Sequence, residues 1–311
     1  MSRKVLVIAG PTASGKSGLA LDLAVALNGV VLNADSMQVY QGMPILSAVP
    51  DEEDRKRAEH RLYEIFAPDT KGSVVDWLRL AAAEIQALWQ EGRLPIVAGG
   101  TGLYLDNLIN GTTPIPETSA EVKQQVRELL AAKGTQAVHQ LLKEHDPEAA
   151  ARLSANDTTR VRRAYEVWLE TGKTLSEWHR LPMVKLLPEA EFVVIKLLPE
   201  QRQLDERCSL RFDRMMEKGA LAEAENLLSL QLDPQLPAMK ALGVPELIEC
   251  LCGRASLEEA VAAAKLHTRQ YAKRQRTWFA RKPNADIQLS ECYEAGGRDL
   301  KNIILDVKKR L

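Results

Sequence analysis

Cysteine is scarce in this chain, and no two cysteines have the spacing that a metal or redox motif requires. The four that occur are Cys208, Cys250, Cys252 and Cys292. Because none of them forms a C-x-x-C pair, we expect neither a zinc ribbon nor a thioredoxin-like redox centre. We interpret them as thiols in a reducing compartment, where disulfides rarely persist.

Long apolar runs are missing as well. No stretch of the sequence approaches the roughly 20 apolar residues that a membrane span needs. Met1 leads almost directly into a short apolar segment that reads as a strand, which leaves no room for a secretory signal. We therefore expect a cytoplasmic protein that does not contact a membrane.

Neither sign of charge is in excess. The chain carries 41 lysines and arginines against 42 aspartates and glutamates, a formal net charge of −1. This balance disfavours a uniformly basic nucleic-acid binder, although it leaves room for local basic patches. A length of 311 residues suffices for one large or two medium domains.

A phosphate-binding motif begins nine residues into the chain. Residues 10–17 read Gly-Pro-Thr-Ala-Ser-Gly-Lys-Ser, a complete G-x-x-x-x-G-K-[ST] loop between an apolar run and apolar residues at helical spacing. In such a loop the backbone N–H groups and the helix N-terminus contact phosphate, the lysine reaches the distal phosphates and the serine binds magnesium. The predicted diphosphate-binding residues are Gly10, Thr12, Ala13, Ser14, Gly15, Lys16 and Ser17. The motif predicts a di- or triphosphate ligand but does not specify the reaction.

Short segments rich in β-branched residues alternate with helical patterns along the chain. Residues 30–33, 95–98, 192–197 and, more weakly, 287–289 have the character of buried parallel strands. We therefore predict an α/β fold, a P-loop NTPase-like parallel sheet flanked by helices. Residues 116–182 show only helical patterns, and we predict an inserted all-helical subdomain there, with residues 1–115 and 183–311 forming the core domain.

Two segments that follow expected strands carry candidate chemistry. Asp35 comes directly after the second strand, at the edge of the sheet where open α/β folds bind substrates. It is a candidate general base, and equally a cap for a following helix. Gln38 offers a donor and an acceptor to the edge of a heterocycle.

The strand at 95–98 is followed by Gly-Gly-Thr-Gly-Leu-Tyr at residues 99–104. A phosphate-loop NTPase would more usually place a metal-holding aspartate here, and its absence argues against NTP hydrolysis. The three glycines around Thr101 indicate a close approach of the backbone to a ligand, or else a plain tight turn.

Two basic clusters stand out in a chain of balanced charge. Residues 268–282 carry six lysines and arginines and no acid, and residues 156–163 hold three more arginines. A solvated helix with an aromatic stripe would account for part of the first cluster. Clusters so unbalanced are also typical of surfaces that contact a phosphate backbone. Together with the phosphate loop, they favour a nucleic-acid substrate over a small metabolite.

Taken together, these segments resemble the tRNA dimethylallyltransferases, also called tRNA isopentenyltransferases or IPP transferases. The matching stretches are residues 10–17, 34–40, 99–104, 156–163 and 268–279, in the family's order and spread over nearly the whole chain. The sequence departs from the family pattern in two places. Residues 42–50 read Gly-Met-Pro-Ile-Leu-Ser-Ala-Val-Pro, and residues 241–246 read Ala-Leu-Gly-Val-Pro-Glu.

The resemblance implies a reaction and a site. The family moves a dimethylallyl group from its diphosphate to the exocyclic N6 amine of the adenine just 3′ of the anticodon. It implies Asp35 as the base, Lys16 and Arg211 as cations on the diphosphate, Thr101 near its bridging oxygen, and Mg²⁺ at Ser17. The expected partners are dimethylallyl diphosphate and a tRNA anticodon stem-loop, bound by a monomer. The tRNA-binding residues implied by the resemblance are Asp35, Ser36, Met37, Gln38, Thr101, Lys123, Thr159, Arg160, Val161, Arg162, Arg163, Lys240, Lys273, Arg274, Gln275, Arg276, Thr277 and Trp278.

Two other classes of function explain part of the sequence. A small-molecule kinase would use the phosphate loop for ATP and Asp35 as a base toward a hydroxyl, but it gives no role to residues 99–104 or to the basic clusters. A non-catalytic, nucleotide-gated RNA-binding protein would use the basic clusters, but it leaves Asp35 without a task.

Overall fold

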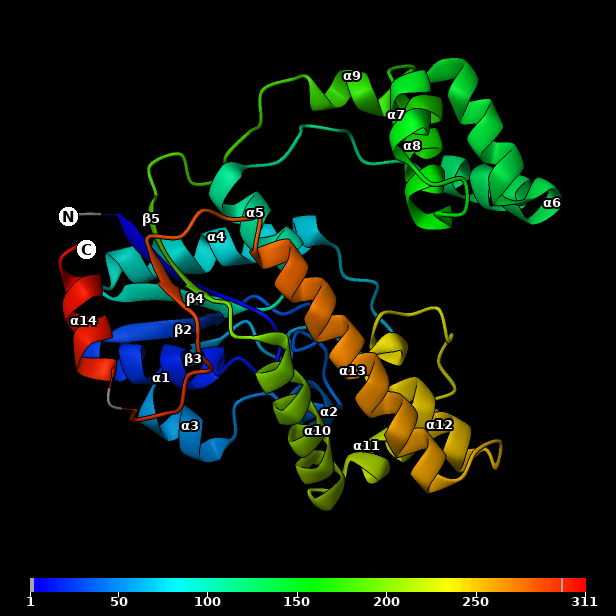
Figure 1. Cartoon of the computed structure of the whole chain (residues 1–311). Helices are drawn as coiled ribbons and strands as arrows, with labels where there is room; N and C mark the ends of the chain where they lie inside the picture. Colours follow the sequence, from blue (N-terminus) through cyan, green and yellow to red (C-terminus); the bar gives the residue numbers. More distant parts are fainter. Residues whose placement is uncertain (1–2, 298) are drawn as a thin grey trace. The chain divides into compact units, whose positions relative to one another are not determined.

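The computed structural model describes residues 3–297 and 299–311. Its centre is a six-stranded sheet with the order β3-β2-β4-β1-β5-β6, in which all the pairings are parallel (Figure 1). The strands are β1 (Lys4–Ala9), β2 (Gly29–Asn33), β3 (His60–Arg61), β4 (Leu94–Gly99), β5 (Glu191–Leu197) and β6 (Ile287–Leu289). The predicted α/β fold is confirmed. The two-residue edge strand β3 was not predicted.

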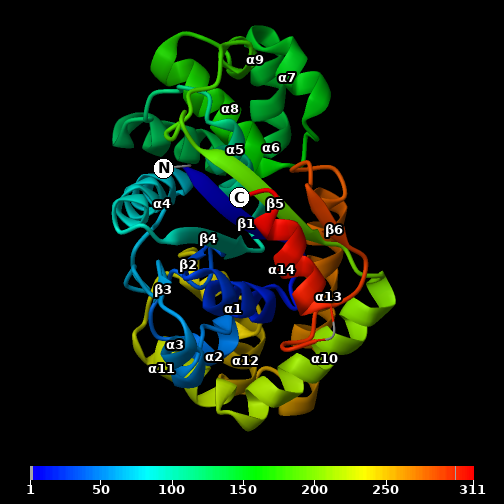
Figure 2. The same ribbon diagram turned by 90° about the vertical axis from the view of Figure 1, so that its left-hand side faces the viewer.

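Helices cover both faces of the sheet, which explains why its strands are almost uniformly apolar. Alternate residues of β1 point to opposite faces: Leu6 and Ile8 pack with helices α1 (Lys16–Leu27) and α14 (Leu300–Lys308). Figure 2 shows these two helices next to each other beside the sheet. Val5 and Val7 pack on the other face, with α4 (Val74–Gln90) and α5 (Gly102–Asn110). The carboxyl ends of the strands are thereby fixed in a rigid frame.

A helical layer follows β5 and supplies part of the site. It consists of α10 (Gln201–Glu217), α11 (Ala220–Ser229), the 3₁₀ turn η1 (Ala238–Lys240), α12 (Val244–Leu251) and α13 (Leu257–Phe279). Gly219, at φ 103°, separates α10 from α11. The long helix α13 begins with a capping box between Ser256 and Glu259 and packs against α10. Two short helices, α2 (Pro44–Ser47) and α3 (Glu52–Arg57), lie between β2 and β3 in the chain.

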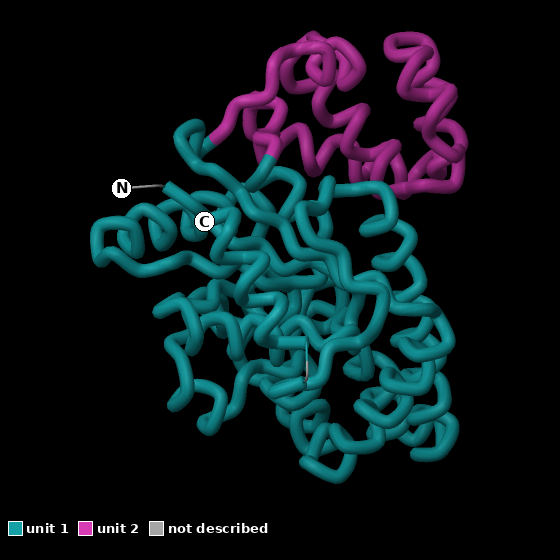
Figure 3. The backbone as a smooth tube through the Cα atoms, turned by 60° about the vertical axis from the view of Figure 1, so that its left-hand side comes forward, with its two compact units in different colours: residues 1–109, 186–311 teal, residues 110–185 magenta. Residues whose placement is uncertain are grey.

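The chain divides into two compact units, coloured separately in Figure 3. The core unit comprises Met1–Ile109 and Leu186–Leu311, and the insert unit comprises Asn110–Lys185. The boundaries that we expected, at 116 and 182, both fall inside the insert unit.

The insert unit is built from helices alone apart from one isolated bridge between Thr112 and Val184. Its helices are α6 (Ala120–His145), α7 (Pro147–Arg152), α8 (Thr158–Thr171) and α9 (Leu175–His179). It has its own small core, in which Val126 and Leu142 of α6 meet Val161 of α8. No helix among the described residues is long and apolar enough to cross a membrane.

Candidate active site

The phosphate loop connects β1 to α1, as its motif predicts. Gly15 caps the N-terminus of α1 at φ 93°, a conformation that L side chains rarely adopt. A Cβ atom at Gly15 would also stand 2.2 Å from the Tyr293 carbonyl oxygen. The Tyr293 N–H donates to the Ser14 carbonyl at 2.9 Å, so the C-terminal segment packs directly on the loop.

Cationic side chains from α10 surround the loop. Arg211 donates to the Thr12 hydroxyl at 2.9 Å, and Arg207 donates to the Ala13 carbonyl at 3.0 Å. Arg207, Arg211 and Arg214 are four and three residues apart, so they share one face of the helix. All three line a cavity of about 630 Å³ with Lys16, Ser17 and other residues of the loop. We name it the donor cavity. Arg211 was expected here, whereas Arg207 and Arg214 were missed, although their spacing from Arg211 is a signal that the sequence carries.

Burial disfavours the charged forms of the basic side chains that line this cavity. Burial, helped by the charge of Arg211 and partly opposed by Asp35, lowers the pKa of Lys16 to about 8. Burial also lowers the pKa of Arg211. The ammonium of Lys16 donates to the Pro11 carbonyl at 2.6 Å. A bound anion such as diphosphate would stabilise both charges.

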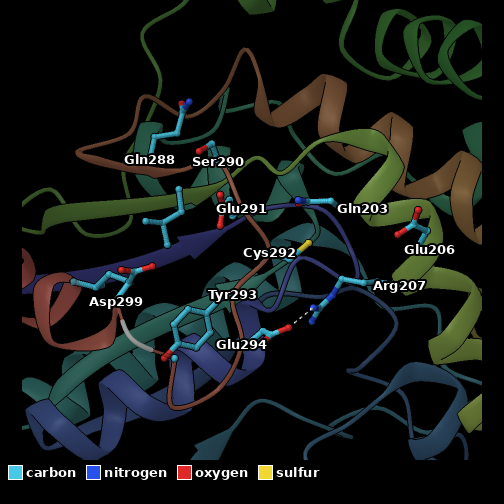
Figure 4. A pocket seen from close by; sticks show the side chains of 13 residues that line it. Gln203, Glu206, Arg207, Gln288, Ser290, Glu291, Cys292, Tyr293, Glu294 and Asp299 are labelled. Atoms are coloured by element: carbon cyan, nitrogen blue, oxygen red, sulfur yellow. Dashed lines mark ion pairs between the residues drawn. The ribbon is translucent and has the colours of Figure 1, made fainter.

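A further cavity adjoins the donor cavity, and Arg207, Tyr293 and Glu294 line both. Its volume is about 640 Å³, and Figure 4 shows its wall, formed by the segment after β6 together with α10. Arg207 pairs with Glu294 at 3.8 Å. The side chains here are mostly polar, so the chemistry of this cavity is unlike that of an isoprenoid tail.

Asp35 is held in place by its own turn and by a buried asparagine. Asn33, at the end of β2, accepts from the Asp35 N–H at 2.8 Å and donates to the Asp35 carbonyl at 3.1 Å. Oδ1 of Asp35 accepts from the Met37 N–H at 2.9 Å. Residues 36–39 form a turn rather than a helix, so Asp35 does not cap a helix. Its Oδ2 atom lies toward Gly100, 3.3 Å from the place of a Cβ there.

The Gly-Gly-Thr-Gly loop after β4 is packed against protein groups. A Cβ at Gly100 would stand 2.5 Å from Nε2 of Gln275, and one at Gly102 would stand 2.1 Å from Nε1 of Trp278. The backbone of this loop therefore comes close to side chains of α13, where we expected a close approach to a ligand. Thr101 accepts from the Ser36 N–H at 2.8 Å and donates to the Ser36 hydroxyl at 3.2 Å. The threonine thus joins this loop to the Asp35 turn.

Gln275 connects the two glycine-rich loops. Its Oε1 atom accepts from the Thr12 N–H at 2.8 Å, and its Nε2 atom donates to the Gly100 carbonyl at 2.7 Å. The residue is buried. We had expected Gln275 to contact tRNA, and this is corrected, because its amide is used inside the protein.

A small cavity of about 40 Å³ lies where the loops meet, and we name it the acceptor cavity. Its lining residues are Thr12, Lys16, Ser17, Asp35, Gln38, Ser47, Tyr63, Ala98, Gly99, Gly100 and Arg211. Nε2 of Gln38 donates to the Ser47 and Ala48 carbonyls at 3.1 and 2.7 Å, which fixes the side chain against α2. Tyr63 was missed, because nothing in the sequence places the segment around β3 beside Asp35.

The basic side chains of α13 are divided between half-buried and exposed positions. Arg269 donates to the Ser209 hydroxyl at 3.2 Å, and Arg276 donates to the Pro199 carbonyl at 2.8 Å. These two arginines tie α13 to the α10 region; the predicted contact of the half-buried Arg276 with tRNA stays a prediction, since only its Nε atom is used here. Lys273 and Arg274 are exposed.

Other residues expected to contact tRNA occupy varied environments. Thr277 donates to the Lys273 carbonyl at 3.0 Å, and Trp278 is 39% exposed. Met37 is partly buried and packs on the main core. Lys240 is exposed and donates to Gln235 at 2.8 Å.

Only part of the basic cluster predicted at residues 156–163 of the insert unit is exposed. Thr159 and Arg160 are exposed at the start of α8. Arg163 donates to the Thr118 hydroxyl at 2.6 Å, and Arg162 lies 3.5 Å from Glu166. Lys123 is half-buried, 3.8 Å from Glu117. The Val161 side chain is fully buried in the core of the unit, so the predicted contact of Val161 with tRNA would have to be made by its backbone.

The oxygen atoms at one end of the acceptor cavity suit magnesium. Ser17 and Asp35 both line this cavity, and Mg²⁺ prefers carboxylate, hydroxyl, water and phosphate oxygens. Within the described part of the chain, no three or more His, Cys, Asp or Glu side chains are grouped as a metal site. The residues present therefore fit an ion held by Ser17 and by the phosphates of a ligand, rather than by a cage of protein groups.

Comparisons with known proteins agree over almost the whole chain. A model of the IPP transferase family matches residues 38–282. The chain is 49% identical over 278 residues to the tRNA dimethylallyltransferase of Rhodospirillum centenum, covering 89% of this chain and 88% of that protein. It is 45% identical over 281 residues to the tRNA dimethylallyltransferase of Granulibacter bethesdensis, covering 90% and 88%.

Solved structures give the same picture. The full-length tRNA isopentenylpyrophosphate transferase of Bacillus halodurans matches with a TM-score of 0.71 and 32% identity, over 99% of this chain and 97% of that one. A eukaryotic dimethylallyltransferase acting on tRNA matches with a TM-score of 0.83 and 28% identity, over 99% and 77%. Because the family model spans most of the chain, and proteins of similar length are nearly half identical to it, this chain belongs to the IPP transferase family.

Proposed function

We propose that this protein transfers the dimethylallyl group of dimethylallyl diphosphate to the exocyclic N6 amine of an adenine in tRNA, the adenine just 3′ of the anticodon. The observation that carries the proposal is that Asp35, Lys16 and Arg211 line one cavity. A proton acceptor for the amine and two cations for a leaving diphosphate are thereby brought together.

The reaction balances with these groups. The C–O bond between the dimethylallyl carbon and the diphosphate breaks, and its electron pair leaves with the diphosphate. The adenine amine forms the new N–C bond and gives one proton to Asp35. An adenine amine is a weak nucleophile, since its lone pair is delocalised into the ring, so a positioned base helps as the bond forms.

Diphosphate release depends on charge stabilisation. Lys16, Arg211 and the backbone N–H groups at the start of α1 would contact the oxygens on which negative charge develops. Mg²⁺ held at Ser17 would supply further charge neutralisation for the diphosphate. The strand β4 ends at Gly99 without an acidic residue, which favours an isoprenoid diphosphate over an NTP that is hydrolysed.

The tRNA partner enters through its single-stranded anticodon loop. Enzymes that modify a base take it out of its stack, so we expect the target adenine to be extruded. The exposed Lys273 and Arg274 on α13, and Arg160 on the insert unit, are suited to contacts with the RNA backbone. We expect the protein to act as a monomer.

The test is a direct transfer assay. The protein is incubated with labelled dimethylallyl diphosphate, magnesium and a tRNA that has adenine 3′ of the anticodon, and label is followed into the RNA. A tRNA with guanine at that position serves as the control. Parallel samples with labelled ATP test for phosphoryl transfer. Label transferred from ATP and none from the isoprenoid diphosphate would replace the proposal with a kinase activity.

A further inference from the structure

Tyr63 lines a cavity of the site but has no role in the reaction as proposed above. It lines the acceptor cavity together with Asp35 and Gln38. Burial raises the pKa of its hydroxyl, and the charge of Asp35 adds to this rise. The phenol therefore stays protonated at working pH and is available as a hydrogen-bond donor.

Within residues 3–297 and 299–311, the hydroxyl of Tyr63 has no hydrogen-bond partner. Its ring, in contrast, is held by neighbouring side chains. His60 contacts the ring edge-on, with centroids 5.7 Å apart, and the Arg55 guanidinium lies 6.0 Å from its centroid. The hydroxyl oxygen is not fully enclosed by protein, and Tyr63 is one of the residues that line the cavity, so a ligand in the cavity is a candidate partner for it.

The backbone on both sides of Tyr63 is strained. Leu62 has φ 67° and Glu64 has φ 53°, which are left-handed conformations that non-glycine residues rarely adopt. Such strain persists where the surroundings over-determine it, and it clusters at functional sites. Here the Asn33 amide donates to the Leu62 carbonyl at 3.1 Å, and the Glu64 N–H donates to the Gln38 carbonyl at 2.9 Å.

The same buried asparagine therefore fixes both the candidate base and Tyr63. Asn33 bonds the backbone of Asp35 on one side and the carbonyl of Leu62 on the other. Because both segments are bonded to Asn33, the positions of the Asp35 carboxylate and the Tyr63 phenol are fixed relative to each other. Asn33 thus places Tyr63 beside Asp35, the group that accepts the proton of the amine. The diphosphate of the donor would instead bind Lys16 and the arginines of α10.

The size of the acceptor cavity limits what reaches these side chains. About 40 Å³ holds roughly three water-sized groups, which is too little for a whole purine. Only the edge of the adenine that carries the amine can enter. On that edge the amine is flanked by ring nitrogens, N1 on one side and N7 on the other, and both accept hydrogen bonds.

We propose that Tyr63 is a substrate-contacting specificity residue, whose hydroxyl donates a hydrogen bond to the ring nitrogen beside the amine of the acceptor adenine. This inference rests on the proposed transfer to adenine. Asp35 and Oε1 of Gln38 are acceptors for the two amine hydrogens, and Tyr63 is the donor that completes the pattern. Guanine would present an oxygen to these acceptors in place of an amine, and would be rejected.

The test combines a side-chain change with single-atom changes in the RNA. Anticodon stem-loop RNAs carry adenine, 1-deazaadenine or 7-deazaadenine at the acceptor position, and kcat/KM is measured for the wild-type protein and for Tyr63→Phe. Tyr40→Phe is the matched control, because the Tyr40 hydroxyl accepts from the Gly72 N–H at 3.2 Å within the protein. Melting temperature and donor affinity are measured for each variant.

With the adenine RNA, Tyr63→Phe should lower kcat/KM by about three- to tenfold, the usual effect of losing one neutral hydrogen bond. With the deaza RNA that lacks the contacted nitrogen, wild type and Tyr63→Phe should be equal. Tyr63→Phe should keep the donor affinity and melting temperature of wild type, whereas Tyr40→Phe should lose stability and respond alike to all three RNAs.

Several outcomes overturn the inference. They are an equal loss by Tyr63→Phe on all three RNAs, no loss on adenine, a loss of donor affinity, or a lower melting temperature. In each of these cases transfer by the wild-type protein still supports the proposed function. A wild-type protein that transfers nothing to the adenine RNA would instead overturn the proposed function and this inference with it.

Discussion

The low pKa of Lys16 predicts how donor binding depends on pH. In the donor-free protein, burial and the neighbouring Arg211 bring the pKa of Lys16 from 10.5 to about 8. A bound diphosphate places negative charge beside the ammonium, which favours the protonated form and returns the pKa toward its ordinary value. Above pH 8, therefore, binding of the donor takes up a proton.

The magnitude follows from this difference. A pKa of about 8 in place of 10.5 corresponds to roughly 3 kcal/mol that the donor-free protein loses when it holds Lys16 charged. Below pH 8 the lysine is already protonated, and its contribution to the donor Kd should not vary with pH. Above pH 8 the Kd should rise by up to about tenfold per pH unit, or roughly a hundredfold between pH 8 and 10.

Folding stability should show the complementary trend. The unfolded lysine keeps its proton up to about pH 10.5, whereas the folded donor-free protein releases it from about pH 8. The unfolded state thus binds more protons between these values, so this group makes the protein more stable as pH rises through the window. Saturation with donor should remove that trend.

Isothermal titration calorimetry measures both the Kd and the proton uptake, when it is repeated in buffers of different ionisation enthalpy at fixed magnesium. Lys16→Arg is the matched control, since its guanidinium stays charged throughout the range and should abolish the slope. Lys16→Met should bind weakly, also without a slope. Cys208 does not interfere before pH 10, because burial raises its pKa to about 11.

Two results would refute this reasoning. One is a donor Kd for the wild-type protein that stays constant from pH 7 to 10. The other is the same slope in Lys16→Arg, which would assign the proton to a different group.

The remaining predictions test the base, the basic surface and the glycine loop. Asp35→Asn should lower the rate of transfer by roughly 10²–10⁴-fold at unchanged donor affinity. A single-turnover rate within a few-fold of wild type would show that Asp35 is not the base and has only the structural role of accepting from the Met37 N–H. Replacing Lys273 and Arg274 by alanine should reduce the slope of log Kd for tRNA against log salt by about 0.7–0.9 for each RNA phosphate that is no longer neutralised; an unchanged slope in filter-binding titrations would place the RNA-binding surface elsewhere. Gly100→Ala should lower stability by about 1–3 kcal/mol in urea melts, because the Cβ would stand 2.5 Å from the clamped Gln275 amide; unchanged stability would contradict that clamp.

Sequence alone located the parts of the site that are local in the chain. The phosphate loop is a contiguous motif whose flanks already specify a strand and a helix, so its position at the start of α1 followed directly. Asp35 was found because it follows a recognisable strand. Arg207 and Arg214 were not, since helical spacing tells which residues share a face but not what that face packs against.

The parts that failed depend on tertiary packing. Gln275 belongs to a run rich in basic and polar residues, yet it is buried against the two glycine-rich loops, and the neighbouring Arg276 is half-buried and bonded to the Pro199 carbonyl. Val161 lies between basic neighbours and is nevertheless one of the core positions of its helix. Tyr63 follows a two-residue strand that no periodicity can reveal, because a pattern needs about four residues to be recognised.

The hydrogen bond from Thr12 to Gln275 joins residues 263 positions apart in the chain. During synthesis the phosphate loop is made before α13, so it lacks this partner until α13 has been made. At about 5–20 residues per second, the interval is roughly 13 to 53 s. A nascent chain therefore cannot complete the contacts of its phosphate loop until α13 has been translated, so a chain that stops before α13 would lack the bond from Thr12 to Gln275.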